Sequence, residues 1–157
     1  MYQMRGNRVA KMQEEEIATR AINFCNAFQI VSSRKKKRYD DVLEALTNYG
    51  ITLDVMDDQD WFNLTYDVTI GHCDPSTLTI TVPNKIYESA CYGDEHALAV
   101  VFHELGHLLL GHQPVLHFSS KDAIQTEDAE WQADTFAEIV LETIGVRTYQ
   151  MSLDFYM

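Results

Sequence analysis

The sequence predicts one α+β domain, residues 1–157, in which helices pack on one face of a small, mainly antiparallel sheet of three strands. Two observations predict it. Apolar residues recur at helical spacing near both ends of the chain, whereas in the middle they alternate with polar residues. A chain of 157 residues, 46% of them hydrophobic, is long and apolar enough to bury its own core. We expect residues 1–13 to be disordered and residues 146–157 to form a C-terminal tail.

Two helices are expected before the strands. The first covers residues 14–28 and has glutamates in its first turn, where the helix dipole favours them. The second covers residues 39–50 and ends at Gly50. Between them lies the basic run Arg34–Arg38, which fits a solvated connection. The alternative is that this run docks a phosphate backbone or an acidic partner.

Three half-buried strands are expected in the middle of the chain, over residues 51–55, 63–70 and 77–82, before Pro83 ends the run. Residues 71–77 contain turn-forming side chains, so we expect the last two strands to form a hairpin. Such a sheet has one covered face and one exposed face.

Two longer helices follow an irregular segment that ends near Gly93. The first covers residues 94–111, with Asp94 as its N-cap and Gly111 as its stop. The second covers residues 127–145.

From residue 99 onward the helix over residues 94–111 is apolar except for a polar group formed by His103, Glu104 and His107. Histidines four residues apart face the same side of a helix, so both can direct a ring nitrogen to one point, as tetrahedral zinc requires. Glu104 then lies beside the ion rather than on it, which is the position of a general base. Gly106 leaves one side of the helix slim enough for close approach of a neighbour.

A third ligand is expected from the last helix, where Glu130 and Asp134 are four residues apart and share a face. Glu130 completes a set of two histidines and one carboxylate, with Glu127 as the reserve candidate. Asp134 is expected to accept the remaining ring N–H of His103 and so to fix its tautomer. The sequence thus predicts one Zn²⁺ per chain, held by His103, His107 and Glu130.

The segments HELGHLLLGH and EDAEWQADTFAEIVL resemble the motifs of the ImmA/IrrE family of metallopeptidases, through His103–His107 and Glu130–Ala137. The resemblance implies a zincin-like fold with thermolysin-type ligation, in a bacterial or mobile-element context. It also implies a substrate, since members of this family commonly cleave a helix-turn-helix repressor encoded beside them. The continuation EIVLETIGVR departs from the family's usual L-M-P ending. Because no DNA-binding domain is fused to the chain, we expect the repressor to be a separate protein.

Charge and composition exclude several functions. A net charge of −12 disfavours direct binding to nucleic acid, which depends on neutralising phosphates. No apolar run approaches 18 residues and the first 20 residues lack the apolar core of a secretory signal, so we expect a cytoplasmic protein with no membrane span. Cys25, Cys73 and Cys91 form no C-x-x-C pair and are expected to be reduced and structural.

These features predict a zinc-dependent endopeptidase in which Glu104 moves the proton and the substrate is a regulatory protein, such as a repressor of a phage or mobile element. We expect an extended peptide to add to the sheet edge. His112, His117, Tyr87 and Tyr92 are candidate donors to the oxyanion, and the sequence does not choose among them. Two alternatives stay open: a zinc-stabilised module that inactivates a repressor or toxin by binding without cleavage, and an amidase acting on a small substrate.

Overall fold

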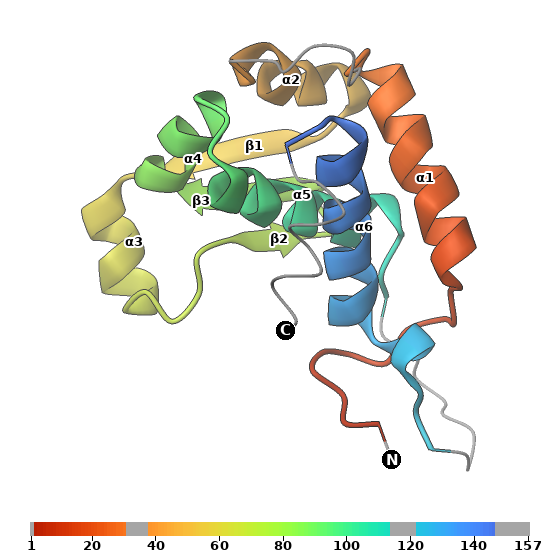
Figure 1. The fold of residues 1–157 in the computed structure, drawn as a ribbon. Coiled ribbons are helices and arrows are strands. Elements are labelled where there is room, and N and C mark those ends of the chain that lie inside the picture. The colour runs from red at the N-terminus through yellow and green to blue at the C-terminus, as the bar shows by residue number, and fades with distance from the viewer. Residues whose placement is uncertain (1, 31–37, 114–121, 147–157) are drawn as a thin grey trace.

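The α+β class is confirmed by the structure, a computed structural model that describes residues 2–30, 38–113 and 122–146 (Figure 1). The expected C-terminal tail lies outside these residues, apart from its first residue. Within the described ranges, no helix has both the length and the apolar character that a membrane span needs. In chain order the elements are α1 (Glu14–Ala27), α2 (Asp40–Ala45), the 3-10 turn η1 (Leu46–Tyr49), β1 (Thr52–Met56), α3 (Asp58–Thr65), β2 (His72–Asp74), β3 (Thr79–Pro83), α4 (Asn84–Cys91), α5 (Glu95–Leu109), the 3-10 turn η2 (Gln125–Glu127) and α6 (Ala129–Thr143).

The three-stranded sheet is mixed, which corrects the expectation of a mainly antiparallel one. Its strand order is β1-β3-β2, so β3 is central. β1 pairs with β3 in parallel, from Thr52 opposite Thr79 to Met56 opposite Pro83, whereas β2 pairs with β3 antiparallel. A parallel pair needs a long crossover connection, and the chain through α3 and β2 supplies it.

The strand expected over residues 63–70 is wrong. Helix α3 occupies the start of this segment, because Asp57 caps its first turn and Trp61 anchors it to the core. Trp61 is 2% exposed, and its indole Nε1–H donates to the carbonyl of Thr69 at 3.0 Å. The apolar residues whose alternation suggested a strand stand in solvent instead; Val68, for example, is 84% exposed.

The expected hairpin exists, but it is shifted along the chain. β2 lies inside the segment 71–77 that the sequence marks as a loop, and the turn falls between β2 and β3. The segment before Gly93, expected to be irregular, contains α4, which buries Ile86 and Ala90. The other expected helices are confirmed, within a few residues, as α1, α2 with η1, α5 and α6.

Helix α5 packs against β2 and β3 on one side and against α6 on the other, and α1 packs against α6 (Figure 1). Phe24, Phe102 and Phe136 join these three helices, with the Phe24 ring centroid 5.9 Å and 6.1 Å from the other two. Gly106 lies where α5 meets α6: a Cβ there would stand 3.1 Å from Phe136 Cδ1 and 3.3 Å from Ala133 Cα. The slim helix face expected at Gly106 is thus confirmed, and it lets side chains of α5 and α6 meet.

Residues 2–13, for which the sequence suggests disorder, run across the start of α6 (Figure 1), and we call them the N-terminal segment. The backbone N–H of Val9 donates to the carbonyl of Glu127 at 2.8 Å, and that of Met12 donates to the carbonyl of Thr126 at 3.0 Å. Both Val9 and Met12 are buried. Since their partners lie far along the chain, no local pattern in the sequence marks this docking.

Candidate metal centre

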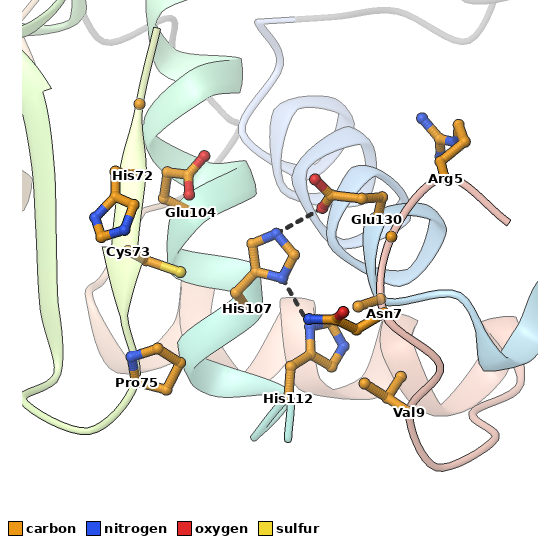
Figure 2. A pocket seen from close by; sticks show the side chains of 13 residues that line it. Arg5, Asn7, Val9, His72, Cys73, Pro75, Glu104, His107, His112 and Glu130 are labelled. Carbon is orange, nitrogen blue, oxygen red and sulfur yellow. Dashed lines mark hydrogen bonds and ion pairs between the residues drawn. The ribbon is translucent and has the colours of Figure 1, made fainter. Parts of the chain in front are cut away.

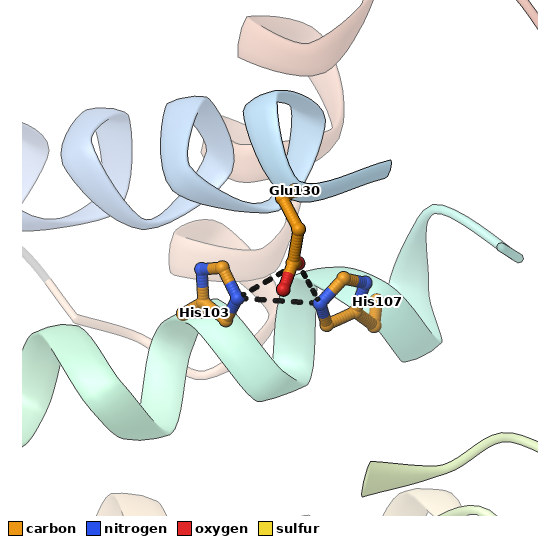
Figure 3. Close-up of side chains that lie close together, drawn as sticks. All are labelled: His103, His107 and Glu130. Atoms are coloured by element: carbon orange, nitrogen blue, oxygen red, sulfur yellow. Dashed lines mark hydrogen bonds and ion pairs between the residues drawn. The ribbon is translucent and has the colours of Figure 1, made fainter. Parts of the chain in front are cut away.

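Helices α5 and α6 bring the three predicted zinc ligands together (Figure 3). His103 and His107 lie one turn apart on α5, and Glu130 stands in the first turn of α6. Oε2 of Glu130 is 2.7 Å from Nε2 of His107 and 3.2 Å from Nε2 of His103. The two Nε2 atoms are 3.2 Å apart. One ligand atom from each residue therefore lies within 4.8 Å of the others, as a single ion requires.

The second ring nitrogen of His103 bonds to Asp134, as expected: Nδ1 lies 2.7 Å from Oδ1 of the carboxylate. An ionised carboxylate only accepts hydrogen bonds, so Nδ1 carries the hydrogen and Nε2 keeps a lone pair for a metal. The other oxygen of Asp134 accepts a hydrogen bond from Nη1 of Arg5 at 2.8 Å. The carboxylate is therefore held at both oxygens.

The second ring nitrogen of His107 bonds to His112, and Gln132 fixes the direction of that bond. Nε2 of Gln132 donates to two backbone carbonyls, at 3.0 Å and 2.7 Å, so its Oε1 must face Nε2 of His112, 2.7 Å away. Nε2 of His112 therefore carries the hydrogen, and its Nδ1 accepts from Nδ1 of His107 at 2.9 Å (Figure 2). His107 is left with its lone pair on Nε2, the atom that faces Glu130.

Both Nε2 lone pairs point at the Glu130 carboxylate, so these acceptor atoms need a cation among them. In the metal-free protein a proton on His103 provides this positive charge. Burial alone would lower the pKa of His103, but hydrogen bonds to Asp134 and Glu130 raise it to about 10. The hydrogen bonds to His103 and His107 hold the pKa of Glu130 well below its usual range. Two imidazole nitrogens and one carboxylate oxygen are a typical ligand set for zinc, so these residues fit a metal ion.

Glu104 faces the pocket on the side of the sheet, next to β2 (Figure 2). Burial raises the pKa of its carboxyl group, to which the thiol of Cys73 forms a hydrogen bond. Gly71, just before β2, permits this close approach: a Cβ there would lie 2.9 Å from Val100 Cγ1 and 3.2 Å from Glu104 Cγ. A side chain at residue 71 would therefore require Val100 or Glu104 to shift.

A pocket of about 610 Å³ contains Glu104, His107 and Glu130 in its lining. One wall is formed by β2 and the residues beside it, and the opposite wall by Arg5, Gly6, Asn7 and Val9 of the N-terminal segment (Figure 2). The candidate metal centre is thus open to solvent between two stretches of backbone, an arrangement with room for an extended chain.

The candidate oxyanion donors have different surroundings. Both ring nitrogens of His112 are engaged within the protein, so we do not propose it as a donor. Tyr87 forms a hydrogen bond with Cys91 in the same helix, α4. Tyr92 follows the last residue of α4, and the guanidinium group of Arg38 lies over its ring. Neither tyrosine belongs to the described lining of the pocket. His117 lies outside the described residues.

Glu127, the reserve ligand, is not part of the metal cluster, because its carboxylate accepts a hydrogen bond from Nη2 of Arg8 at 3.0 Å. Of the basic run Arg34–Arg38, residues 34–37 lie outside the described part of the chain. Arg38 pairs with Asp40, Nη2 to Oδ2, at 2.6 Å.

Sequence reasoning missed Arg5, Gln132 and Gly71, which act through partners distant along the chain. The sequence did offer one indication of Gln132: it is an amide on the apolar face of a predicted helix, where a polar side chain is expected to have buried hydrogen-bond partners. Comparison of the chain with protein-family models, with curated proteins and with solved structures found no match.

Proposed function

We propose that the chain is a zinc-dependent endopeptidase of the cytoplasm that cleaves a regulatory protein, such as a helix-turn-helix repressor of a phage or mobile element. One observation carries the proposal: the ligand atoms of His103, His107 and Glu130 converge beside the Glu104 carboxylate, in an open pocket. Two histidines from an H-E-x-x-H helix and a carboxylate from a later helix are the ligand pattern of zinc metallopeptidases. The resemblance to the ImmA/IrrE family points the same way.

The proposed chemistry is hydrolysis of a peptide bond. Zinc would supply Lewis-acid chemistry, since the bound ion acidifies water and polarises a carbonyl group. Glu104 takes a proton from the attacking water and passes it to the departing amine, while the remaining hydroxyl becomes part of the new carboxylate. The burial that raises the pKa of Glu104 makes its carboxylate a stronger base for the first transfer and keeps the proton at hand for the second.

We place the proposed substrate along strand β2. Among the strands that the structure describes, β2 pairs with β3 alone and is an edge strand, and its residues His72 and Cys73 line the pocket together with Glu104. An extended peptide can pair with such an edge as a further strand, which brings its backbone past the carboxylate. The net charge of −12 favours a substrate that is basic near the cleavage site, as the DNA-binding face of a repressor is.

The test compares new protein N-termini in host cells that express the wild type, Glu104→Gln or the control Glu44→Gln. Glu44 is an exposed carboxylate on α2, away from the pocket. The host carries the native genetic neighbourhood, including any adjacent repressor, and the zinc content of each purified protein is measured in parallel. We expect a new N-terminus with the wild type and Glu44→Gln and none with Glu104→Gln, while all three proteins hold one zinc per chain.

A different result would support the non-cleaving alternative. If Glu104→Gln still holds zinc and still relieves repression, and no new N-terminus appears with any protein, then the metal stabilises a binding module. A wild-type protein that holds no zinc would contradict both functions.

A further inference from the structure

We propose that the N-terminal segment is the positioning element of the metal centre, because it supports each of the three ligands through a separate contact. The inference rests on the proposed metal site but not on peptidase activity. Its contacts come from residues 5–10, and they reach Glu130 directly and the two histidines through side chains of α6 and His112.

The first contact is with Glu130. Gly6 lies so close to this side chain that a Cβ at residue 6 would stand 2.6 Å from Glu130 Cγ. Ordinary side chains do not approach to that distance, so only glycine fits here and the backbone of the segment limits where the carboxylate can go. Oδ1 of Asp128 accepts the N–H of Gly6 at 3.1 Å and that of Glu130 at 3.0 Å, which joins the two residues through one atom.

The second contact reaches His103. The guanidinium of Arg5 donates to Oδ2 of Asp134 at 2.8 Å, and Oδ1 of the same carboxylate accepts from Nδ1 of His103 at 2.7 Å. Arg5 is itself fixed by its backbone N–H, which donates to Oδ2 of Asp128 at 2.9 Å. Asp134 therefore faces His103 in one orientation.

The third contact reaches His107. The carbonyl of Ala10 accepts from Nε2 of Gln132 at 3.0 Å and so helps to turn Oε1 of that amide towards His112. His112 accepts in turn from Nδ1 of His107 at 2.9 Å. The hydrogen on His107 is thus placed through a chain that begins at the backbone of the N-terminal segment.

These three routes start within six consecutive residues and end at ligands on two helices. Because the ligand side chains are held in place by the segment, less conformational freedom is lost when an ion binds, which favours tight binding. Displacing the segment should therefore weaken metal binding even in a protein that stays folded.

The experiment measures Zn²⁺ affinity by competition with a chromophoric chelator, on the full chain. The variants are Gly6→Ala, Arg5→Ala and the control Lys11→Ala, an exposed residue of the same segment. We expect Gly6→Ala to lose about 10-fold or more in affinity, Arg5→Ala to lose less, and Lys11→Ala to match the wild type. Circular dichroism and thermal unfolding of the metal-free proteins establish that each is folded; Arg5 is exposed, so its variant tests the inference even if Gly6→Ala does not fold.

A double-mutant cycle tests the route through Glu130. Glu130→Ala removes the Cγ atom that a methyl group at residue 6 would meet. In that background, Gly6→Ala should cause no further loss of the residual affinity, since interacting residues are non-additive. A full additional loss would show that Gly6 does not act through Glu130.

Wild-type affinity in both Gly6→Ala and Arg5→Ala, with both proteins folded, would overturn the inference and leave the metal site itself in place. Failure of the wild type to bind Zn²⁺ would instead overturn the proposed function.

Discussion

Nδ1 of His112 lies 2.9 Å from Nδ1 of His107, and this contact determines which nitrogen of His107 is free to bind a metal. Burial lowers the pKa of His112 to about 4, so at neutral pH its ring has one N–H and one lone pair. Oε1 of Gln132 accepts the N–H of His112, so the lone pair on the other ring nitrogen of His112 is available to accept from His107. A neutral His112 therefore accepts the N–H at Nδ1 of His107, which leaves Nε2 of His107 as the nitrogen that can bind a metal.

Gln132→Ala tests this relay. Without the amide oxygen nothing holds the hydrogen on Nε2 of His112, so its ring can donate to His107 and favour the wrong tautomer there. We expect Zn²⁺ affinity to fall about 10- to 100-fold, measured by chelator competition. The ring nitrogen shifts of His107 and His112 in NMR spectra of the metal-free protein report the tautomers directly. Gln59→Ala, an exposed amide on α3, is the control.

The relay would be contradicted if Gln132→Ala kept both the wild-type affinity and the wild-type ring nitrogen shifts. A loss of affinity with unchanged shifts would assign Gln132 a packing role instead. Gln132 is fully buried, so the free energy of unfolding of the variant is measured alongside.

The sequence predicted the parts of the site that are local to a helix. The four-residue spacings of His103 with His107 and of Glu130 with Asp134 put each pair on one helix face, and the structure brings both faces together. It also predicted α1, α2 with η1, α5 and α6 to within a few residues, because periodicity is a short-range property, but it missed α3 and α4.

The rest depended on contacts between distant residues or on competing local signals. Arg5 reaches Asp134 across almost the whole chain, so nothing near residue 5 indicates its role. Between residues 63 and 70 the apolar alternation competed with the cap at Asp57 and the anchor at Trp61, which favour a helix and prevailed. The parallel pairing of β1 with β3 follows from tertiary packing rather than from a sequence pattern.

The reactivity of Cys73 should report its contact with Glu104. Burial and the nearby Glu104 carboxylate raise the pKa of this thiol to about 12, so at neutral pH almost none of it is thiolate. We expect iodoacetamide to alkylate Cys73 slowly, with a rate that rises about tenfold per pH unit below that pKa. Glu104→Gln removes the negative charge and should raise the rate at a given pH, as measured by peptide mass spectrometry of the metal-free protein.

Cys25 provides an internal control for that experiment. Burial alone raises the pKa of its thiol to about 11, and Glu104 is not among the causes. Its rate should be the same in both proteins. Equal rates for Cys73 in the wild type and Glu104→Gln would show that the two side chains do not meet as the structure has them.

Asp128 is expected to stabilise the fold by joining the N-terminal segment to α6. Its carboxylate accepts hydrogen bonds from Tyr2 Oη at 2.7 Å and from the backbone N–H groups of Arg5, Gly6 and Glu130. Asp128→Ala should lower the free energy of unfolding of the metal-free protein by about 2–4 kcal/mol, since it removes both an N-cap and a charged acceptor. Urea unfolding measures this, with Asp54→Ala, an exposed carboxylate on β1, as the control.

The contribution of Asp128 should also depend on pH. Burial alone would raise the pKa of its carboxyl group, but the hydrogen-bond donors lower it overall. A folded pKa below the unfolded value of about 3.9 means that the stabilisation is complete above that value and is lost as the pH falls through the folded pKa. The difference between wild type and Asp128→Ala should therefore shrink in acid; a difference that stays constant to low pH would contradict this assignment.

The packing of α5 on α6 at Gly106 should be as important to the metal site as to the fold. Valine at residue 106 places three carbons where a single Cβ would already stand 3.1 Å from Phe136 Cδ1 and 3.3 Å from Ala133 Cα. We expect Gly106→Val to cost about 1–3 kcal/mol of unfolding free energy. Because the two helices must separate, Glu130 moves away from His103 and His107, so Zn²⁺ affinity should fall as well. Valine has a higher helix propensity than glycine, so a loss must come from packing, and His96→Val, which introduces valine at an exposed position of α5, is the control for valine away from the interface. Lost stability with unchanged Zn²⁺ affinity would mean that the three ligands keep their positions when the packing of α5 on α6 is disturbed.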